Sequence, residues 1–165
     1  MTRLQETASP DTGLLPDFVE PVSDSDRSPR PADPGFLEVD SDGHYGYNAG
    51  RTPWRLGTDA LLNADQTALT QVQKLSSWIA DATERDPQNI RAGYELDGTP
   101  APGSDYVTTF FAAPFGVAAM TVPDQLQWLN DLYDAVYDQT ENYYEDTVTL
   151  LCLLVMTGNF WDPTA

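Results

Sequence analysis

The sequence contains very little of three residue types on which many metal and redox sites depend: it has one cysteine, one histidine and one lysine in 165 residues. The single cysteine, Cys152, excludes an internal disulfide bond and a cysteine-based metal site. Because Cys152 lies within the apolar run of residues 150–156, we expect it to be a buried core filler. His44 has no second histidine or cysteine as a co-ligand, so we expect no metal site and no cofactor, and we place His44 in a loop at the rim of a cleft.

Long hydrophobic runs are also missing. No stretch approaches the roughly 18 apolar residues that a membrane-spanning helix needs, so the sequence predicts no membrane span. Residues 1–10 are polar and lack the apolar centre of a signal peptide. We therefore expect no export signal within this chain.

Positive charge is scarce relative to negative charge. Eight Lys+Arg against 26 Asp+Glu give a formal charge of -18, and the sequence pI is about 4.1. Such a charge repels nucleic acid and anionic membrane surfaces, so we expect neither as a partner. A cationic polymer would be attracted, but the acidic residues are spread over the whole length. We interpret the acidity as adaptation to high salt, typical of a halophilic source, rather than as recognition of a cationic ligand.

The distribution of proline divides the chain into two parts. Residues 1–46 contain six prolines and the polar run Ser23–Ser28, which predict a loop-rich segment. Residues 47–165 are dominated by helical patterns. A short strand or hairpin arm is predicted at residues 91–98, ending in an Asp-Gly turn.

Apolar spacing and capping residues predict five helices after residue 46. They cover about residues 52–63, 65–83, 106–121, 123–137 and 143–157. Thr52 and Asp65 are the predicted N-caps of the first two, and Asp146 is the predicted cap of the fifth. The first helix is predicted to turn Trp54, Leu61 and Leu62 inward.

The third and fifth helices are apolar on nearly all sides, whereas the second and fourth are amphipathic. Alternation of buried and covering helices predicts an all-α fold of the two-layer toroid type rather than a simple bundle. Five helices are too few to close such a ring. The chain is therefore expected to form part of a larger barrel or to need a partner.

Several stretches in the right order closely resemble glycoside hydrolase family 8. They are Thr12–Asp17, Tyr47–Asp59, Gly93–Gly98, Ala112–Met120 and Tyr144–Phe160. The resemblance implies a partial (α/α)6 barrel, about half of the ring and corresponding to the C-terminal half of a family member, with residues 1–46 carrying part of the cleft. It also implies inverting hydrolysis of β-linked polysaccharide (β-glucan, chitosan or xylan) and secretion of the full-length enzyme.

Inverting hydrolysis needs two carboxyl groups about 6.5–9.5 Å apart, an acid for the leaving oxygen and a base for water. By the resemblance, the acid is a glutamate on an N-terminal segment, and a second aspartate that holds the central sugar lies in the same half. Neither motif is present here. We expect the chain alone to be inactive and to need the missing N-terminal half or another copy of the chain.

The resemblance places Asn48 where many family members carry the catalytic base. An amide has no useful basicity, so Asn48 can only orient water by hydrogen bonds. One branch of the family, which includes chitosanases, uses a glutamate on the preceding loop, and Glu38 occupies such a loop. Its apolar neighbours Leu37 and Val39 are expected to desolvate it and raise its pKa. The alternatives are that Asp40 or Asp42 is the base, or that Glu38 is an ordinary surface acid and the chain has no base.

Four further residues match family positions that contact substrate. Tyr47 and Arg51 correspond to positions near the cleaved bond; the alternative for Arg51 is a structural ion pair with Asp59. Tyr143 and Tyr144 correspond to aromatic sugar contacts; the alternative for Tyr144 is packing within the barrel. A competing hypothesis from another class is a non-catalytic carbohydrate-binding or degenerate helical domain.

Overall fold

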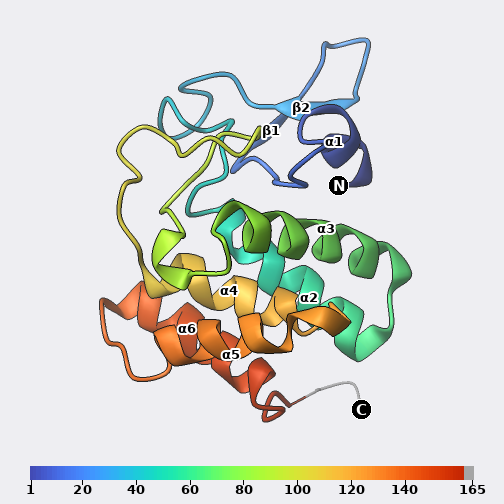
Figure 1. The fold of residues 1–165 in the computed structure, drawn as a ribbon. Coiled ribbons are helices and arrows are strands. Elements are labelled where there is room, and N and C mark those ends of the chain that lie inside the picture. Colours follow the sequence, from blue (N-terminus) through green and yellow to red (C-terminus); the bar gives the residue numbers. More distant parts are fainter. Residues whose placement is uncertain (162–165) are drawn as a thin grey trace.

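Helices dominate the regular structure of the computed structural model, which describes residues 1–161 (Figure 1). The α-helices are α1 (Thr2–Thr7), α2 (Thr52–Asn63), α3 (Gln66–Ala82), α4 (Thr109–Ala119), α5 (Leu126–Val136) and α6 (Tyr143–Met156). The remaining elements are strands β1 (Val19–Pro21) and β2 (Pro29–Pro31) and the 3₁₀ turns η1 (Ala49–Arg51), η2 (Pro87–Asn89) and η3 (Pro123–Gln125). Within the described part of the chain, no helix is long and apolar enough to cross a lipid bilayer.

The N-terminal segment lies on one side of the helices, above them in Figure 1. It consists mainly of loops, as its prolines predict, but it also contains α1 and an antiparallel ribbon of β1 and β2 that the sequence did not reveal. The ribbon pairs Val19 with Pro31 and Pro21 with Pro29. The prolines occupy non-hydrogen-bonded positions of the ladder, because its flanking bonds run from the Ala32 N–H to the Phe18 carbonyl and from the Val22 N–H to the Ser28 carbonyl.

The starts of α2 and α3 show how capping fixes the helices. Asp65 caps α3 as predicted, since its side chain accepts a hydrogen bond from the Ala68 N–H over 2.6 Å. The prediction of Thr52 as an N-cap is wrong. Thr52 is the first residue of α2, which continues directly from η1, so the chain is already helical before Thr52.

Helix α4 begins later than the predicted Tyr106. Thr108 is extended, with φ -133° and ψ 154°, and its hydroxyl accepts a hydrogen bond from the Phe111 N–H at 3.4 Å. The preceding segment is not helical, since it is turned and tied to residue 92, whose N–H donates to the carbonyls of Ser104 and Tyr106. The predicted hairpin arm is reduced to isolated bridges of Tyr94 with its neighbours, with no regular strand.

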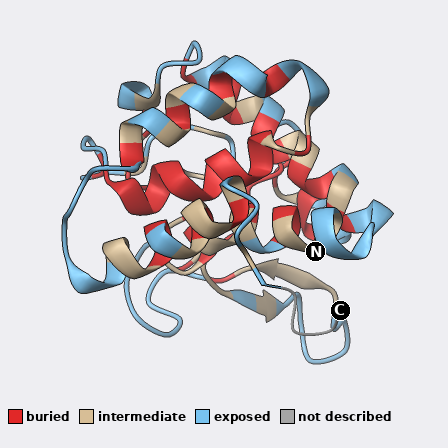
Figure 2. Ribbon diagram, turned by 90° about the horizontal axis from the view of Figure 1, so that it is seen from below, coloured by how far each residue is buried: buried red, intermediate tan, exposed pale blue. Residues whose placement is uncertain are grey.

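Helix α4 is the centre of the core, and all of its residues are buried (Figure 2). It packs against α2, α3, α5 and α6. Small residues allow the closest of these approaches. A Cβ atom on Gly57 of α2 would lie 2.9 Å from Val117 Cγ1 of α4, and one on Gly116 would overlap the Met156 side chain of α6. The prediction that the third helix is buried on all sides is confirmed.

The same prediction for the fifth helix is wrong. In α6, Val148, Cys152 and Val155 are buried, but Leu150 is 58% exposed and Leu154 is only half-buried. Helix α6 packs mainly on α4, and within residues 1–161 no other helix covers its opposite face. Helix α6 is therefore apolar on all sides, but the described part of this chain buries only the side that faces α4.

Two details of the helix predictions are also corrected. Leu61 and Leu62 are exposed, because the last turn of α2 extends beyond α4. Asp146 lies in the first turn of α6, whose N-cap is Asn142, and the Asp146 carboxylate accepts a hydrogen bond from the Glu141 N–H at 2.8 Å. Asp146 thus stabilises the start of the helix from inside it.

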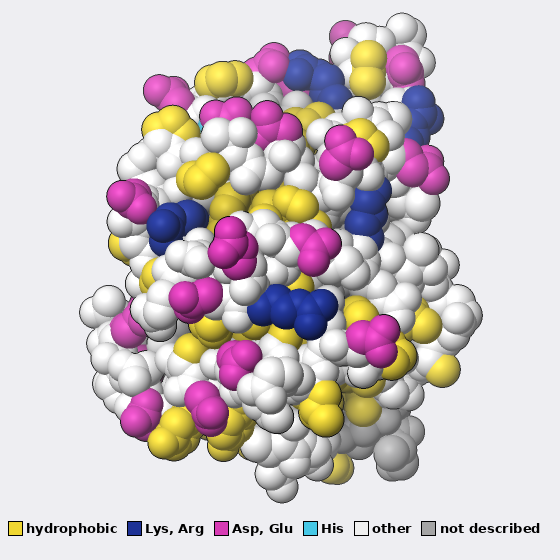
Figure 3. Space-filling view, in the orientation of Figure 1, with side chains coloured by type: hydrophobic (Ala, Val, Ile, Leu, Met, Phe, Trp, Pro, Cys, Tyr) yellow, Lys and Arg dark blue, Asp and Glu magenta, His cyan; other side chains and the backbone are white. Residues whose placement is uncertain are grey.

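Acidic side chains are spread over the molecular surface. On the face shown in Figure 3, Asp and Glu side chains lie over all parts of the molecule, with a few arginines between them. This distribution agrees with the spread of Asp and Glu along the sequence.

Candidate active site

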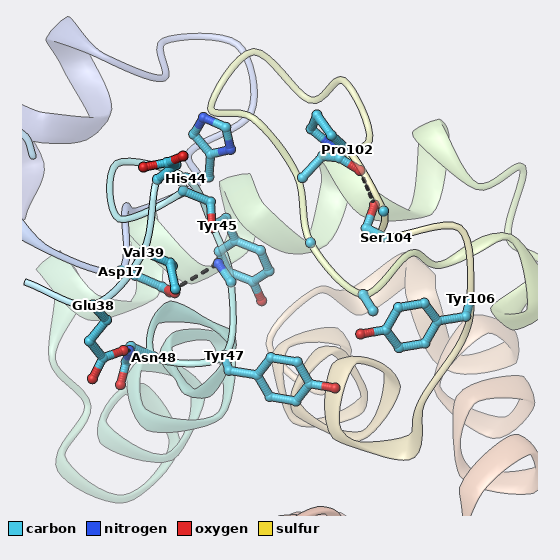
Figure 4. A pocket seen from close by; sticks show the side chains of 17 residues that line it. Asp17, Glu38, Val39, His44, Tyr45, Tyr47, Asn48, Pro102, Ser104 and Tyr106 are labelled. Carbon is cyan, nitrogen blue, oxygen red and sulfur yellow. Dashed lines mark hydrogen bonds between the residues drawn. The ribbon is translucent and has the colours of Figure 1, made fainter. Parts of the chain in front are cut away.

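A pocket of about 570 Å³ lies between the loop of residues 38–48 and the segment of residues 92–106, which turns back on itself at residues 96–98 and 102–103 (Figure 4). Its acidic lining residues are Asp17, Glu38 and Asp40, and no lysine or arginine lines it. The two pocket walls are joined behind the cavity by a pair of backbone hydrogen bonds of 2.9 Å between Tyr45 and Tyr94. The pocket therefore has a rigid back wall and a negatively charged lining.

Glu38 and Asn48 meet at one end of this pocket. The Asn48 Nδ2 donates a hydrogen bond to Glu38 Oε2 at 3.2 Å. At the other end of the same amide, Arg51 Nη2 donates to Asn48 Oδ1 at 3.1 Å, and Arg51 Nε donates to the Asn48 carbonyl at 3.2 Å. Because Arg51 can only donate, it fixes the amide with its oxygen toward Arg51 and its nitrogen toward Glu38.

Arg51 does not form the alternative ion pair with Asp59. Asp59 instead accepts a hydrogen bond from the Asn63 side chain at 2.7 Å, and no salt bridge within the described residues joins it to Arg51. The structure thus brings Arg51, Asn48 and Glu38 into one hydrogen-bonded array.

The loop of Glu38 differs from the sequence-based expectation in one respect. Glu38 is exposed, and so are its neighbours Leu37 and Val39. The expected desolvation of the Glu38 carboxyl group by these apolar neighbours is therefore not observed. Glu38 lines the pocket and is accessible to water.

The other two candidate bases occupy contrasting positions. Asp40 is exposed and lines the pocket. Asp42 is buried, and its carboxylate accepts hydrogen bonds from three consecutive backbone N–H groups, at residues 37, 38 and 39. Desolvation opposes the effect, but these backbone hydrogen bonds together lower the pKa of Asp42. A carboxylate with its oxygens occupied in this way is a poor proton acceptor.

Asp17 belongs to the site but was not selected from the sequence. Its Oδ1 accepts hydrogen bonds from the Gly46 N–H at 2.9 Å and the Ala49 N–H at 2.6 Å. Burial is the largest influence on its pKa and raises it, against the effect of these N–H groups, and the nearby Glu38 charge raises it further. Asp17 lies within the stretch that resembles family 8, and this position was the one sequence signal available for it.

Aromatic rings form the opposite side of the site. The Tyr47 ring stacks on Phe110 with centroids 5.0 Å apart, and Tyr144 stacks on Phe110 at 5.2 Å. Burial, and then hydrogen bonding with Tyr106, raises the pKa of Tyr47, and the two hydroxyl groups point toward one another in Figure 4. Tyr47 and Tyr144 are therefore brought together as one aromatic cluster beside the pocket.

Tyr143 is not part of this cluster: it is 88% exposed at the start of α6 and does not line the pocket. Trp54, expected in the core, is only partly buried and packs against the edge of the core away from the pocket. His44 lines the pocket, and its Nδ1 is buried without a hydrogen-bond partner.

Cys152 is buried, which confirms its assignment as core filler, and burial raises its pKa. Within residues 1–161, no cluster of His, Cys, Asp and Glu has the arrangement of a metal site.

Curated proteins similar in sequence are glucan-degrading enzymes. The chain is 45% identical to a β-glucanase of Niallia circulans over 154 residues, covering 93% of this chain and 36% of that protein. It is 34% identical to an endoglucanase of Bacillus sp. (strain KSM-330), covering 98% of this chain and 34% of that protein. The chain thus spans about a third of the length of these relatives. A scan of family models gives no match.

Solved structures with the same fold are similar over nearly the whole chain. The apo structure of a β-1,3-1,4-glucanase from Paenibacillus sp. X4 matches with a TM-score of 0.90 and 42% identity, covering 97% of this chain and 41% of that one. A GH8 xylobiose complex from Teredinibacter turnerae matches with a TM-score of 0.68 at 22% identity, covering 92% and 36%. The second match concerns the fold alone.

Proposed function

This chain is related to glycoside hydrolase family 8 and folds as part of its (α/α)6 barrel, and on that premise we propose that it supplies the base-bearing wall of an inverting β-glucanase. The observation that carries the proposal is the array of Glu38, Asn48 and Arg51 at the pocket. In this proposal Glu38 is the general base and Asn48 orients the attacking water. Arg51 holds the Asn48 amide in the orientation that leaves its N–H groups facing Glu38.

The chemistry of the proposal follows from the two side chains. The Glu38 carboxylate takes a proton from water as the water oxygen attacks the anomeric carbon, and the Asn48 amide keeps that water in place by hydrogen bonds. Exposure of Glu38 suits this role because the attacking water must reach it from the open pocket. The second carboxyl group, which protonates the leaving oxygen, is proposed to come from outside this chain. The chain alone is then inactive.

Aromatic and polar residues beside the array are proposed to bind sugar rings. Tyr47 and Tyr144 offer flat apolar faces to a pyranose, and Arg51 offers N–H donors to its hydroxyl groups. Tyr143, projecting from α6 into solvent, is proposed to contact a sugar further along the polysaccharide chain.

β-Glucan is the substrate class that the proposal favours. Support comes from the Paenibacillus enzyme, a β-1,3-1,4-glucanase whose structure matches with a TM-score of 0.90. Chitosan is the second candidate, because three acidic residues and no lysine or arginine line the pocket.

The uncovered face of α6 is proposed to dock the rest of the barrel or a second copy of this chain. Leu150 and Leu154 lie on that face, four residues apart and therefore on the same side of the helix. Burial of such a stripe by another helix would stabilise the assembly through the hydrophobic effect.

The proposed function is tested with the 165-residue chain alone and with a chimera in which this chain replaces the matching 41% of the Paenibacillus glucanase. Both are incubated with mixed-linkage β-glucan, carboxymethyl cellulose and chitosan, and reducing ends are measured. The proposal expects no turnover by the chain alone and glucan hydrolysis by the chimera. Turnover by the chain alone would show that its own residues include the acid.

The same two proteins distinguish the proposed function from the alternative of a non-catalytic carbohydrate-binding domain. The alternative expects cello-oligosaccharide binding by the chain in calorimetry, with a folded chimera that binds glucan but releases no reducing ends. Hydrolysis of chitosan alone would replace β-glucan by chitosan as the substrate and leave the roles of Glu38 and Asn48 in place.

A further inference from the structure

Asp42 holds the loop that carries Glu38. Its Oδ2 accepts hydrogen bonds from the Leu37 N–H at 2.5 Å and the Glu38 N–H at 3.0 Å, and its Oδ1 accepts one from the Val39 N–H at 2.9 Å. The Asp42 N–H also donates to the Val39 carbonyl at 3.1 Å, which closes the loop on itself. Leu37, Glu38 and Val39 are exposed, so no packing of their own side chains orders this loop. Besides a hydrogen bond from the Gly35 N–H to the Val39 carbonyl, the Asp42 carboxylate supplies the hydrogen bonds that order this loop.

Asp17 holds the turn that carries Asn48. The Gly46 and Ala49 N–H groups, on either side of Tyr47 and Asn48, both donate to Asp17 Oδ1. A Cβ atom at Gly46 would lie 2.5 Å from Asp17 Oδ2, so the turn and the carboxylate fit closely. Figure 4 shows Asp17 above Glu38 and Asn48 in the view, hydrogen-bonded to the turn.

The two anchors share one backbone frame. The Asp17 N–H donates to the His44 carbonyl at 2.7 Å, and the neighbouring Phe18 N–H donates to the Asp42 carbonyl at 2.9 Å. Residues 17–18 and 42–44 therefore run side by side. A displacement of either carboxylate changes the relative position of the two loops, and with it the 3.2 Å contact between Glu38 and Asn48.

We propose that Asp42 and Asp17 are positioning residues that jointly set the geometry of Glu38 and Asn48, Asp42 acting on the first and Asp17 on the second. This inference rests on the proposed function of that pair. Neither aspartate takes the proton from water. Each acts through the backbone of the residue that it holds, and together they replace the packing that the exposed Glu38 loop lacks.

The energetics of Asp17 agree with a positioning role. Because burial raises its pKa, an ionised Asp17 is less favourable in the folded chain than in water. A charged group held in place at a cost in stability is more typical of functional sites than of ordinary structural positions.

The first test measures amide hydrogen exchange by NMR in the 165-residue chain. Asp42→Asn replaces Oδ2, which accepts from the Leu37 and Glu38 N–H groups, by an amide nitrogen, so these two N–H groups should exchange about tenfold faster, whereas those of Gly46 and Ala49 should not change. Asp17→Ala should accelerate exchange at Gly46 and Ala49 and leave exchange in the Glu38 loop unchanged. Asp17→Asn keeps Oδ1 as an acceptor for both N–H groups and should behave nearly as wild type.

A matched control uses an aspartate that holds a loop far from the pocket. Asp26 accepts a hydrogen bond from the Ser28 N–H at 2.9 Å in the turn between β1 and β2. Asp26→Ala, which removes this acceptor, should accelerate exchange at Ser28 and nowhere in the pocket. Thermal melting followed by circular dichroism shows whether each variant is folded. If Asp42→Asn does not fold, Asp42→Ser, which retains one acceptor, replaces it.

A second readout separates positioning from a merely structural role. The Asn48 side-chain amide resonances should move in Asp42→Asn toward those in Glu38→Ala, since both variants remove the same contact. In the glucanase chimera, Asp42→Asn should lower kcat about tenfold or more with KM nearly unchanged, and should cause no further loss when combined with Glu38→Gln.

The outcomes are distinguishable. Unchanged exchange at Leu37 and Glu38 in Asp42→Asn, or an unchanged kcat in a chimera whose turnover depends on Glu38, would overturn the positioning role. A chimera without any turnover would contradict the proposed function only, and the exchange and Asn48 resonances would then decide the positioning role by themselves.

Discussion

The side-chain amide of Asn48 donates to the carboxylate of Glu38 over 3.2 Å, and the two residues are ten positions apart in the sequence. The contact joins a residue on an exposed loop to one at the start of a helical segment. Within residues 1–161 the Glu38 side chain makes no other hydrogen bond. The contact therefore forms only if the backbone of the Glu38 loop lies close to Asn48. The geometry thus couples the proposed base to the amide that orients its water.

Replacement of Asn48 by aspartate should create a pair of interacting carboxyl groups. Two like charges at this distance are unfavourable, so the Glu38 carboxyl in Asn48→Asp should keep its proton to a higher pH than in the unchanged chain. NMR titration of the glutamate side-chain carbons in the isolated chain measures this directly. Asn48→Ala removes the hydrogen bond without adding a charge and should give a clearly smaller shift. Equal titration of Glu38 in Asn48→Asp and Asn48→Ala would show that the two side chains do not meet in solution.

Order in the Glu38 loop should depend on pH through Asp42. The ordinary pKa of this group is 3.8, and it is lowered in the folded chain. A lowered pKa stabilises the folded loop at pH values above 3.8, and this contribution is lost as the pH falls through the lowered value. Protection of the amides of residues 37–39 should therefore persist to pH 4 and decline below it. In Asp42→Asn this decline should be absent. Loss of protection between pH 7 and pH 5 would contradict this assignment.

Because α4 is closely packed, alanine substitutions at Gly57 and Gly116 should lower the free energy of unfolding by different amounts. Gly57→Ala places a methyl group against both the side chain and the backbone carbonyl of Val117, and it should cost about 1–3 kcal/mol. Gly116→Ala meets the flexible end of Met156, which can move, so it should cost less. Both variants gain the same helix propensity, so their difference in urea unfolding reports packing alone. Equal stabilities would mean that α2 and α4 are less tightly packed than described.

Salt should stabilise the chain if its acidity reflects a saline habitat. With a formal charge of -18, self-repulsion is large at low ionic strength and is screened by added KCl. A gain of about 1–2 kcal/mol corresponds to roughly 2–8 °C in melting temperature for a chain of this size. The same salt step at a pH near the pI of about 4.1 is the control and should have a smaller effect. A melting temperature that does not rise with KCl at pH 7 would argue against halophilic adaptation.

The parts of the fold that local sequence determines were predictable. Asp65 is followed by a long amphipathic pattern, and α3 begins at the next residue. The apolar residues of α4 predicted its burial on every side. For α6 the same reasoning wrongly predicted burial on nearly all sides. Its residues are apolar around the whole helix, but this chain supplies a packing neighbour mainly on the side of α4. Leu150 remains exposed for that reason.

The site was predictable to a similar extent. Glu38 and Asn48 could be paired from the resemblance, and the structure brings them together. Asp17 could not be identified from its own surroundings, since its partners lie 29 and 32 residues further along the chain. The role of Asp42 was equally hidden, because a buried carboxylate that binds N–H groups and an exposed one that binds water look alike in a sequence. Tertiary contacts decide between these environments.

The central claim is that Glu38 takes the proton from the attacking water, and turnover of the glucanase chimera carrying Glu38→Gln tests it most directly. Removal of a general base should lower kcat on mixed-linkage β-glucan by about 10²–10⁴-fold with KM little changed. Asp40→Asn, a change of the other exposed acid in the same pocket, should leave kcat within about threefold of wild type. Retention of turnover in Glu38→Gln, or its loss in Asp40→Asn instead, would contradict the assignment of Glu38.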